Sequence, residues 1–211
     1  MIQFLMKYPD KIVEPFLQHI QITLITLALS FVIAAGISFL IMRSRALSQV
    51  VIGIFSAVYA IPSLALFALL VPLLGLGETA AIVVLTAYNQ FILVRNIIAG
   101  FHSISPSILE AANGMGMSQS QSFFRIRLPL ASPVILAGIK VSVTTTIGIA
   151  TIASTINAGG LGDLLFDGLR TQNMVKILWG TLLASLLAVA ANLLLGVLEK
   201  RAQQFAGGIK V

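Results

Sequence analysis

The sequence predicts an all-α integral membrane protein with about five transmembrane helices. Of its 211 residues, 58% are hydrophobic and only 9% are charged, whereas a soluble domain carries about 25% charged residues to cover its surface. The apolar residues also gather in runs of roughly 20, the length that crosses about 30 Å of hydrocarbon. We therefore expect the solvent of most of this chain to be lipid.

Five apolar runs are long enough to span a membrane, at about residues 20–42, 50–74, 79–100, 133–155 and 177–198. The first is too long for the core of a signal peptide and ends on Arg43 and Arg45, so we expect the mature protein to begin at Met1. The second is interrupted by Pro62 and Pro72, which predict a kink.

The spans divide the chain into three parts. Residues 1–17 are expected to form a short extracytoplasmic helix on the membrane surface, with a frayed terminus as the alternative. Residues 18–199 would form the transmembrane domain, and residues 200–211 a cytoplasmic tail.

The basic residues are unevenly divided between the two sides of the predicted membrane. One side holds the loop after the first span, the loop at residues 101–128 and the C-terminus, with eight Lys or Arg and two acidic residues. The other side holds four basic and five acidic residues. Because basic loops remain in the cytoplasm, we expect the N-terminus outside and the C-terminus inside. The net charge of +6 is then explained by topology and anionic lipid, and nucleic-acid binding is not expected.

Several kinds of chemistry are not expected. The chain has no cysteine, and its two histidines, His19 and His102, lie at opposite ends of spans. It has no Walker A, HExxH or GxSxG motif, so we predict neither catalysis nor ATP hydrolysis, and no metal or cofactor. A secondary carrier is a weaker alternative, because coupling ions usually require acidic residues within the spans.

The loop at residues 101–128 is the most structured of the polar segments. Ser105 followed by Pro106 predicts the start of a helix. Gly114 and Gly116 can adopt the left-handed conformation that ends one. The sequence therefore predicts a short helix that closes on a glycine turn.

A second short helix is expected after this turn. Residues 118–121 read Ser-Gln-Ser-Gln, the pattern of a capping box, and the helix would run through Phe123 and Phe124 until Pro129 ends it. An ordered loop with no partner is the alternative interpretation of residues 101–128.

A longer pattern runs through both helices: Glu-Ala-Ala, three residues, Gly, nine residues, Ile, one residue, Leu-Pro. Its positions are filled by Glu110, Ala111, Ala112, Gly116, Ile126, Leu128 and Pro129. The pattern resembles the cytoplasmic coupling loop of the membrane-spanning permease subunits of bacterial ABC importers. This resemblance implies a non-enzymatic subunit of the bacterial cytoplasmic membrane, in which these residues form the contact with ABC ATPase subunits.

The rest of the chain extends the resemblance. The span count is similar to the small methionine-type permease fold, and residues 128–140 and 158–164 resemble the osmoprotectant subfamily, which carries glycine betaine, carnitine, choline and proline. The Gly-Gly-Leu-Gly-Asp stretch at residues 159–163 is also similar to methionine importers, so an amino acid is the alternative solute. The resemblance further implies a second permease, identical or homologous, and a separate extracytoplasmic binding protein.

Polar and aromatic residues within the spans are candidates for the solute pathway. The candidates are Tyr59, Tyr88, Asn89, Thr145 and Thr146. Aromatic faces attract quaternary ammonium cations. Helix packing is the favoured alternative for the hydroxyl-rich fourth span, because small residues let helices approach closely.

Two further expectations concern the ends of the spans. Lys140 should extend to the cytoplasmic face, or pair with Glu110 or a lipid headgroup. The outer loop at residues 156–176 is expected to be flexible at its glycines, with Asp163, Asp167 and Arg170 available to a docking protein.

Overall fold

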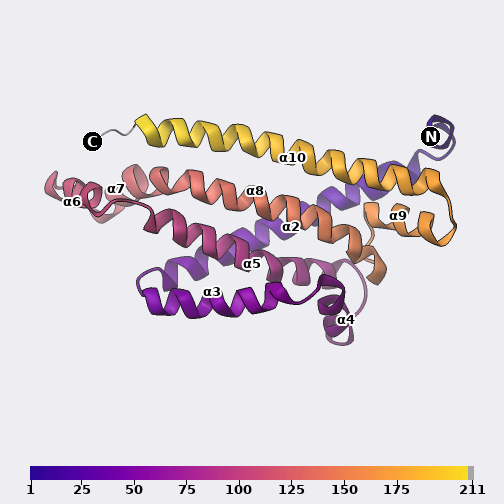
Figure 1. Ribbon diagram of the computed structural model, residues 1–211, viewed down its shortest axis with the longest axis horizontal. Coiled ribbons are helices and arrows are strands. Elements are labelled where there is room, and N and C mark those ends of the chain that lie inside the picture. The colour runs from indigo at the N-terminus through magenta and orange to yellow at the C-terminus, as the bar shows by residue number, and fades with distance from the viewer. Residues whose placement is uncertain (209–211) are drawn as a thin grey trace.

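The computed structural model describes residues 1–208, and every regular element within them is helical. Figure 1 shows a bundle of long, roughly aligned helices with short helices at its two ends. The elements are α1 (Ile2–Lys7), α2 (Asp10–Ile41), α3 (Arg45–Ala60), α4 (Ser63–Leu74), α5 (Glu78–His102), α6 (Pro106–Gly114), α7 (Gln119–Ser122), the π-helical segment η1 (Phe123–Arg127), α8 (Leu128–Ala153), the 3-10 turn η2 (Ser154–Ile156), α9 (Leu161–Arg170) and α10 (Met174–Gly208).

Four helices are long and apolar enough to cross a membrane, and a bent pair brings the number to as many as five. The four are α2, α5, α10 and the continuous helix at Gln119–Ile156. The bent pair is α3 and α4, which meet at 96°. The predicted all-α membrane fold is therefore confirmed, although the predicted second span consists of two helices that meet at a sharp break rather than one kinked helix.

The break between α3 and α4 follows from proline geometry. Pro62 disfavours helical backbone at the residue before it, and Ile61 is extended, with φ −68° and ψ 130°. The carbonyl oxygen of Ile61 accepts a hydrogen bond from the hydroxyl of Tyr88 on α5. The chain thus turns sharply without leaving this carbonyl unpaired.

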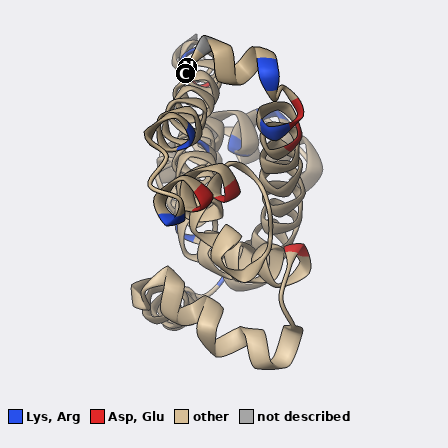
Figure 2. Cartoon of the chain, turned by 90° about the vertical axis from the view of Figure 1, so that its right-hand side faces the viewer, with Lys and Arg blue, Asp and Glu red and all other residues tan. Residues whose placement is uncertain are grey.

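The two ends of the bundle carry different segments (Figure 1). The turn between α2 and α3, the helices α6 and α7, and the C-terminal part of α10 lie together at one end, which we call the basic end. The N-terminus and α9 lie at the other, the α9 end, where Figure 2 shows acidic and basic residues side by side. This is the grouping that the charge distribution predicted.

The boundaries at both chain termini differ from those predicted. The first long helix begins at Asp10, so α1 alone is separate from it and residues 10–17 continue into the span. Ile12 is 4% exposed, which shows that this part packs against the protein. At the other terminus α10 continues as a helix through residues 200–208, while residues 209–211 of the predicted tail lie outside the described part.

The centre of the bundle is α5. It packs against α2, α3, α4 and α8, and 61% of its most apolar segment is buried, against 0% for that of α10. Because α10 packs mainly along α8 and α9, most of its surface is not covered by the described part of this chain.

The outer loop is ordered, contrary to the prediction of flexibility. Two side chains of α2 hold the start of α9. Gln18 Oε1 accepts a hydrogen bond from the backbone nitrogen of Gly160 at 3.0 Å. Nδ1 of the buried His19 accepts one from the nitrogen of Leu161 at 3.3 Å, which leaves its Nε2 proton to bond the carbonyl oxygen of Ile147 at 3.2 Å. One imidazole therefore joins α2, α8 and α9.

The glycines of this loop serve close packing rather than flexibility. At Gly162 an added Cβ atom would lie 1.9 Å from the carbonyl oxygen of Thr151 on α8. Only a residue without a side chain allows α9 to approach α8 this closely.

The Gly162→Ala variant should therefore destabilise the protein by about 1–3 kcal/mol, the usual cost of overpacking. Its control is Gly148→Ala on α8, where an added Cβ meets nothing within 4 Å and helix propensity favours alanine. The midpoint of thermal unfolding of the detergent-purified protein measures the difference. Equal midpoints for the two variants would show that the α8–α9 contact is loose.

Candidate functional site

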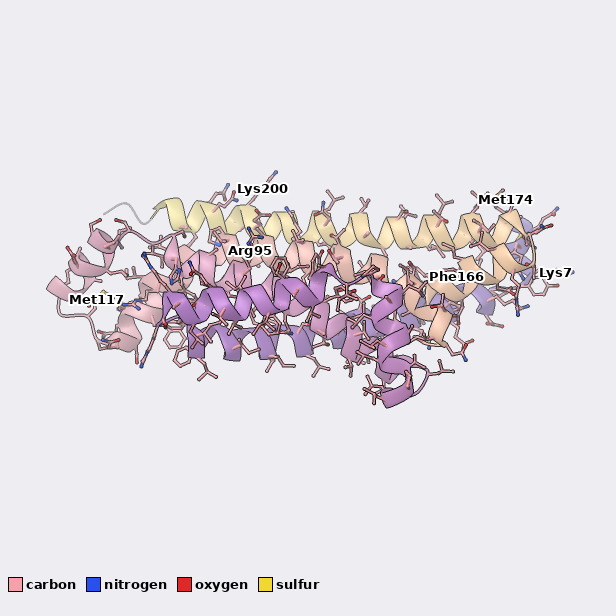
Figure 3. The ribbon with its side chains drawn as sticks, turned by 60° about the horizontal axis from the view of Figure 1, so that its bottom comes forward. Lys7, Arg95, Met117, Phe166, Met174 and Lys200 are labelled. Atoms are coloured by element: carbon pink, nitrogen blue, oxygen red, sulfur yellow. The ribbon has the colours of Figure 1, made fainter. Side chains whose placement is uncertain are left out.

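The loop at residues 101–128 forms the tip of the basic end. Figure 3 shows Met117 at the opposite end of the molecule from Lys7 and Phe166. The first helix of the loop, α6, begins with Pro106 in its first turn, as predicted. Ser105 does not cap it, because its hydroxyl pairs with that of Ser107 at 2.7 Å.

The turn after α6 is a Schellman motif. The nitrogen of Met117 bonds the carbonyl oxygen of Ala112 at 3.2 Å, and the nitrogen of Gly116 bonds that of Asn113 at 2.9 Å. These are the two bonds that close the motif, and its left-handed position is usually glycine. Gly116 occupies that position with φ +74°, which confirms the predicted glycine turn.

A capping box follows directly. The nitrogen of Gln121 donates to Ser118 Oγ at 3.2 Å, and the nitrogen of Ser118 donates to Gln121 Oε1 at 2.9 Å. The second helix predicted for the loop is therefore confirmed at its start. The backbone nitrogens of the turn between α6 and α7 therefore all donate hydrogen bonds.

The second helix does not end at Pro129, contrary to the prediction. Its bonding shifts through the π-helical segment, in which the nitrogen of Leu128 reaches the carbonyl oxygen of Phe123. Pro133 has no N–H and so cannot donate the usual helical hydrogen bond to the carbonyl oxygen of Pro129. That oxygen instead accepts a hydrogen bond from the hydroxyl of Ser132 at 2.8 Å. The helix therefore continues from the loop into the span without a joint.

The residues of the Glu-Ala-Ala pattern lie on two elements. Glu110 and Gly116 are exposed on α6 and its turn, whereas Ala112 is 1% exposed and faces the protein itself. Ala111, Ile126, Leu128 and Pro129 are partly exposed or lie at the margin of exposure. A partner that binds this tip would therefore meet Glu110 first, while Ala112 serves internal packing.

Two of the candidate pathway residues belong to a buried hydrogen-bond network. Asn89 Nδ2 donates to Thr146 Oγ1 at 2.9 Å and to Ser30 Oγ at 3.3 Å. Its Oδ1 accepts the hydroxyl of Ser142 at 2.6 Å. Asn89 and Thr146 are each 1% exposed. The network ties α2, α5 and α8 together, as the packing alternative for the hydroxyl-rich span predicted.

The aromatic candidates lie beside the break between α3 and α4. The rings of Tyr59 and Tyr88 meet edge to face at 5.7 Å between centroids, and those of Tyr59 and Phe91 are 5.1 Å apart. The guanidinium carbon of Arg95 lies 5.7 Å from the centroid of the Phe91 ring. Tyr59 is half-buried and Tyr88 is buried, so Tyr59 is the more accessible ring.

Thr145 lies apart from both groups. It is partly exposed, whereas the neighbouring Thr146 faces Asn89 in the core. The structure therefore does not bring the five pathway candidates into one site.

An ion pair missed by the sequence analysis joins the last two spans. Lys140 Nζ lies 2.7 Å from Glu199 Oε2, with both side chains largely buried. Lys140 therefore pairs with Glu199 and not with Glu110, which was the alternative to an extension of its side chain to the cytoplasmic face. Glu199 lies one residue before the predicted tail, and only the continuation of α10 as a helix places it beside α8.

Charges on α9 form a second cluster at the opposite end. Asp167 pairs with Lys176 at 2.5 Å and with Arg170 at 2.9 Å, and the hydrogen bonds from these side chains hold the pKa of its carboxyl below the usual value. Burial raises the pKa of Asp163. The side chain of Arg170 is 81% exposed, which leaves it the most available of the three residues predicted to contact a docking protein.

Known proteins match the chain along nearly its whole length. Residues 27–204 match the model of the family described as binding-protein-dependent transport system inner membrane component. The chain is 35% identical over 200 residues to the choline transport system permease protein OpuBB of Bacillus subtilis (strain 168), covering 95% of this chain and 92% of that protein. It is 36% identical over 184 residues to the carnitine transport permease protein OpuCB of Listeria monocytogenes, with 87% and 84% covered.

A solved structure shares the fold. The chain matches a chain of the MetNI methionine ABC transporter, solved in an inward-facing conformation, with a TM-score of 0.79 at 20% identity, covering 90% of this chain and 95% of that one. The protein is a member of the binding-protein-dependent transport system inner membrane component family, the permeases of ABC importers.

Proposed function

We propose that this permease couples ATP hydrolysis by partner subunits to the import of a quaternary ammonium solute such as choline, carnitine or glycine betaine. The observation that carries the proposal is the tip at residues 106–128, in which two helices are joined by a Schellman motif and a capping box. The chain itself would not be an enzyme, and ABC ATPase subunits would bind this tip.

The tip is suited to transmit force because it has no loose joint. The turn between α6 and α7 is closed by backbone and side-chain hydrogen bonds. From α7 one helix continues to Ile156, and α8 packs along the central helix α5. A displacement of α6 by a partner would therefore move α8 against α5 rather than be absorbed in the loop.

The remaining parts of the proposal concern orientation and partners. The basic end would face the cytoplasm of a bacterial cell, with the N-terminus outside, because basic loops stay inside. The α9 end would then receive a separate extracytoplasmic binding protein, and exposed Arg170 is a candidate contact. A second permease copy or a homologue would complete the pathway, consistent with the exposed apolar surface of α10.

The solute class rests on two observations. Relatives at 35% and 36% identity are named for choline and carnitine transport. Tyr59 and Phe91 also present aromatic rings beside the α3–α4 break, and such rings attract quaternary ammonium cations. Methionine remains the alternative solute and would be tested as a competitor.

Coupling through the tip predicts that uptake depends on the left-handed backbone at Gly116. Gly116→Val should lower ATP-driven choline uptake by about tenfold or more, because a β-branched residue is strained at positive φ by over 1 kcal/mol. Gly116→Asn should retain most uptake, since asparagine tolerates this conformation. Uptake and ATP hydrolysis are measured in proteoliposomes that contain the co-purified ATPase and binding protein.

Gly114→Val is the matched control for this prediction. Gly114 lies two residues away on α6, has no positive φ, and an added Cβ there meets nothing within 4 Å. Full uptake by Gly116→Val, or an equal loss in Gly114→Val, would contradict the coupling role of the turn.

A role for Tyr59 in the pathway predicts that its ring, rather than its hydroxyl, matters. Tyr59→Phe should keep the initial rate of choline uptake, whereas Tyr59→Ala should lower it by about 2- to 30-fold, the range of one cation–π contact. Binding of the ATPase should be unchanged in both variants. If Tyr59→Ala transports choline at the full rate, the ring lies outside the pathway, while coupling through the tip is untouched.

A further inference from the structure

Two hollows lie next to each other at the basic end, between α2 and the π-helical segment. An apolar groove of about 280 Å³ is lined by Phe31, Ala35, Phe39, Met42, Ile97, Phe101, Phe123, Leu128 and Ile135. An interfacial hollow of about 560 Å³ is lined by Phe39, Met42, Arg43, Gln119, Ser120, Phe123, Phe124 and Arg127. Phe39, Met42 and Phe123 line both, so the two hollows are adjacent and share a wall.

The apolar groove has the depth of one membrane leaflet. Its wall runs from Phe31 on α2 to Met42, the residue that caps α2, and the rise between these two residues is roughly 16 Å at about 1.5 Å per residue. Half of the hydrocarbon core of a bilayer is about 15 Å. The groove therefore extends from the end of the span to about its middle.

The mouth of the groove carries two arginines without acidic partners. The ion pairs found in residues 1–208 join Lys140 to Glu199 and Asp167 to both Arg170 and Lys176, and none includes Arg43 or Arg127. Nε of Arg127 is buried and has no hydrogen-bond acceptor in that part of the chain. A charged nitrogen buried without an acceptor is costly, so an anion from outside the chain would stabilise this mouth.

We infer that the two adjacent hollows bind one anionic glycerophospholipid, with its phosphate between Arg43 and Arg127 and one acyl chain in the apolar groove. Guanidinium groups match phosphate oxygens in geometry and charge. A free phosphate would leave the apolar groove empty, and an acidic side chain of an ATPase would not extend to the middle of the span. Only an amphiphile fills both parts.

The first test measures phospholipid binding to the detergent-purified full-length chain by native mass spectrometry. Phosphatidylglycerol and phosphatidylcholine are titrated, and the dissociation constant of the first bound lipid is compared. The wild-type protein should favour phosphatidylglycerol. Arg43→Gln with Arg127→Gln should weaken its binding by about 25-fold, since one arginine near a lipid surface accounts for about fivefold, and should leave phosphatidylcholine binding unchanged.

The matched control is Arg45→Gln with Arg125→Gln, which removes the same charge from exposed positions at the same end that do not line the hollows. An equal loss in this control would overturn the site in favour of diffuse surface charge. Ala35→Phe should weaken phosphatidylglycerol binding without changing charge, because it fills the groove.

Two further outcomes would also overturn the inference. If soluble glycerol 3-phosphate displaces the bound lipid at concentrations near its own binding constant, the mouth is a free-anion site. If the double variant at Arg43 and Arg127 keeps its lipid but no longer co-purifies with an ATPase, the arginines bind protein. Lipid binding is measured on the chain without its ATPase, whereas coupling is measured as uptake by the Gly116 variants, so the proposed function and this site fail separately.

Discussion

The contact between α5 and α8 is the constraint on which the rest of the structure depends. The chain leaves α5 at His102, forms the tip, and returns directly into α8, so this one helix pair fixes both ends of the tip. Asn89 on α5 bonds hydroxyls of Ser142 and Thr146 on α8. Such bonds cannot be exchanged for water within lipid, which makes the register of the two helices specific.

Features of the tip that depend on sequence neighbours could be predicted. The left-handed turn at Gly116 and the capping box at Ser118 follow from bonds spanning five residues or fewer, and the helix start at Pro106 follows from the fixed φ of proline. The stop expected at Pro129 was wrong for a local reason as well. A π-helical shift and the hydroxyl of Ser132 together supply alternatives for the bonds that the prolines lack.

Contacts between distant residues could not be predicted from one sequence. Gln18 and Gly160 are 142 positions apart, and Lys140 and Glu199 are 59 apart. A glycine is expected to be flexible when only the sequence is known, because the sequence does not reveal which residues lie next to it in space. At Gly162 that neighbour is the backbone of α8. The same holds for candidate pathway residues, because only the fold reveals that Asn89 faces the core while Tyr59 remains partly accessible.

The way the core satisfies its polar groups limits where a solute can pass. Both amide atoms of Asn89 are bonded within the chain, and Tyr88 is bonded to the α3–α4 break, so neither is available to a solute unless the bundle opens. A cation that passed between α5 and α8 would have to break this network in an apolar surrounding. Under the proposed function, the pathway therefore lies outside the α5–α8 contact, on the side of the bundle where half-buried Tyr59 lies.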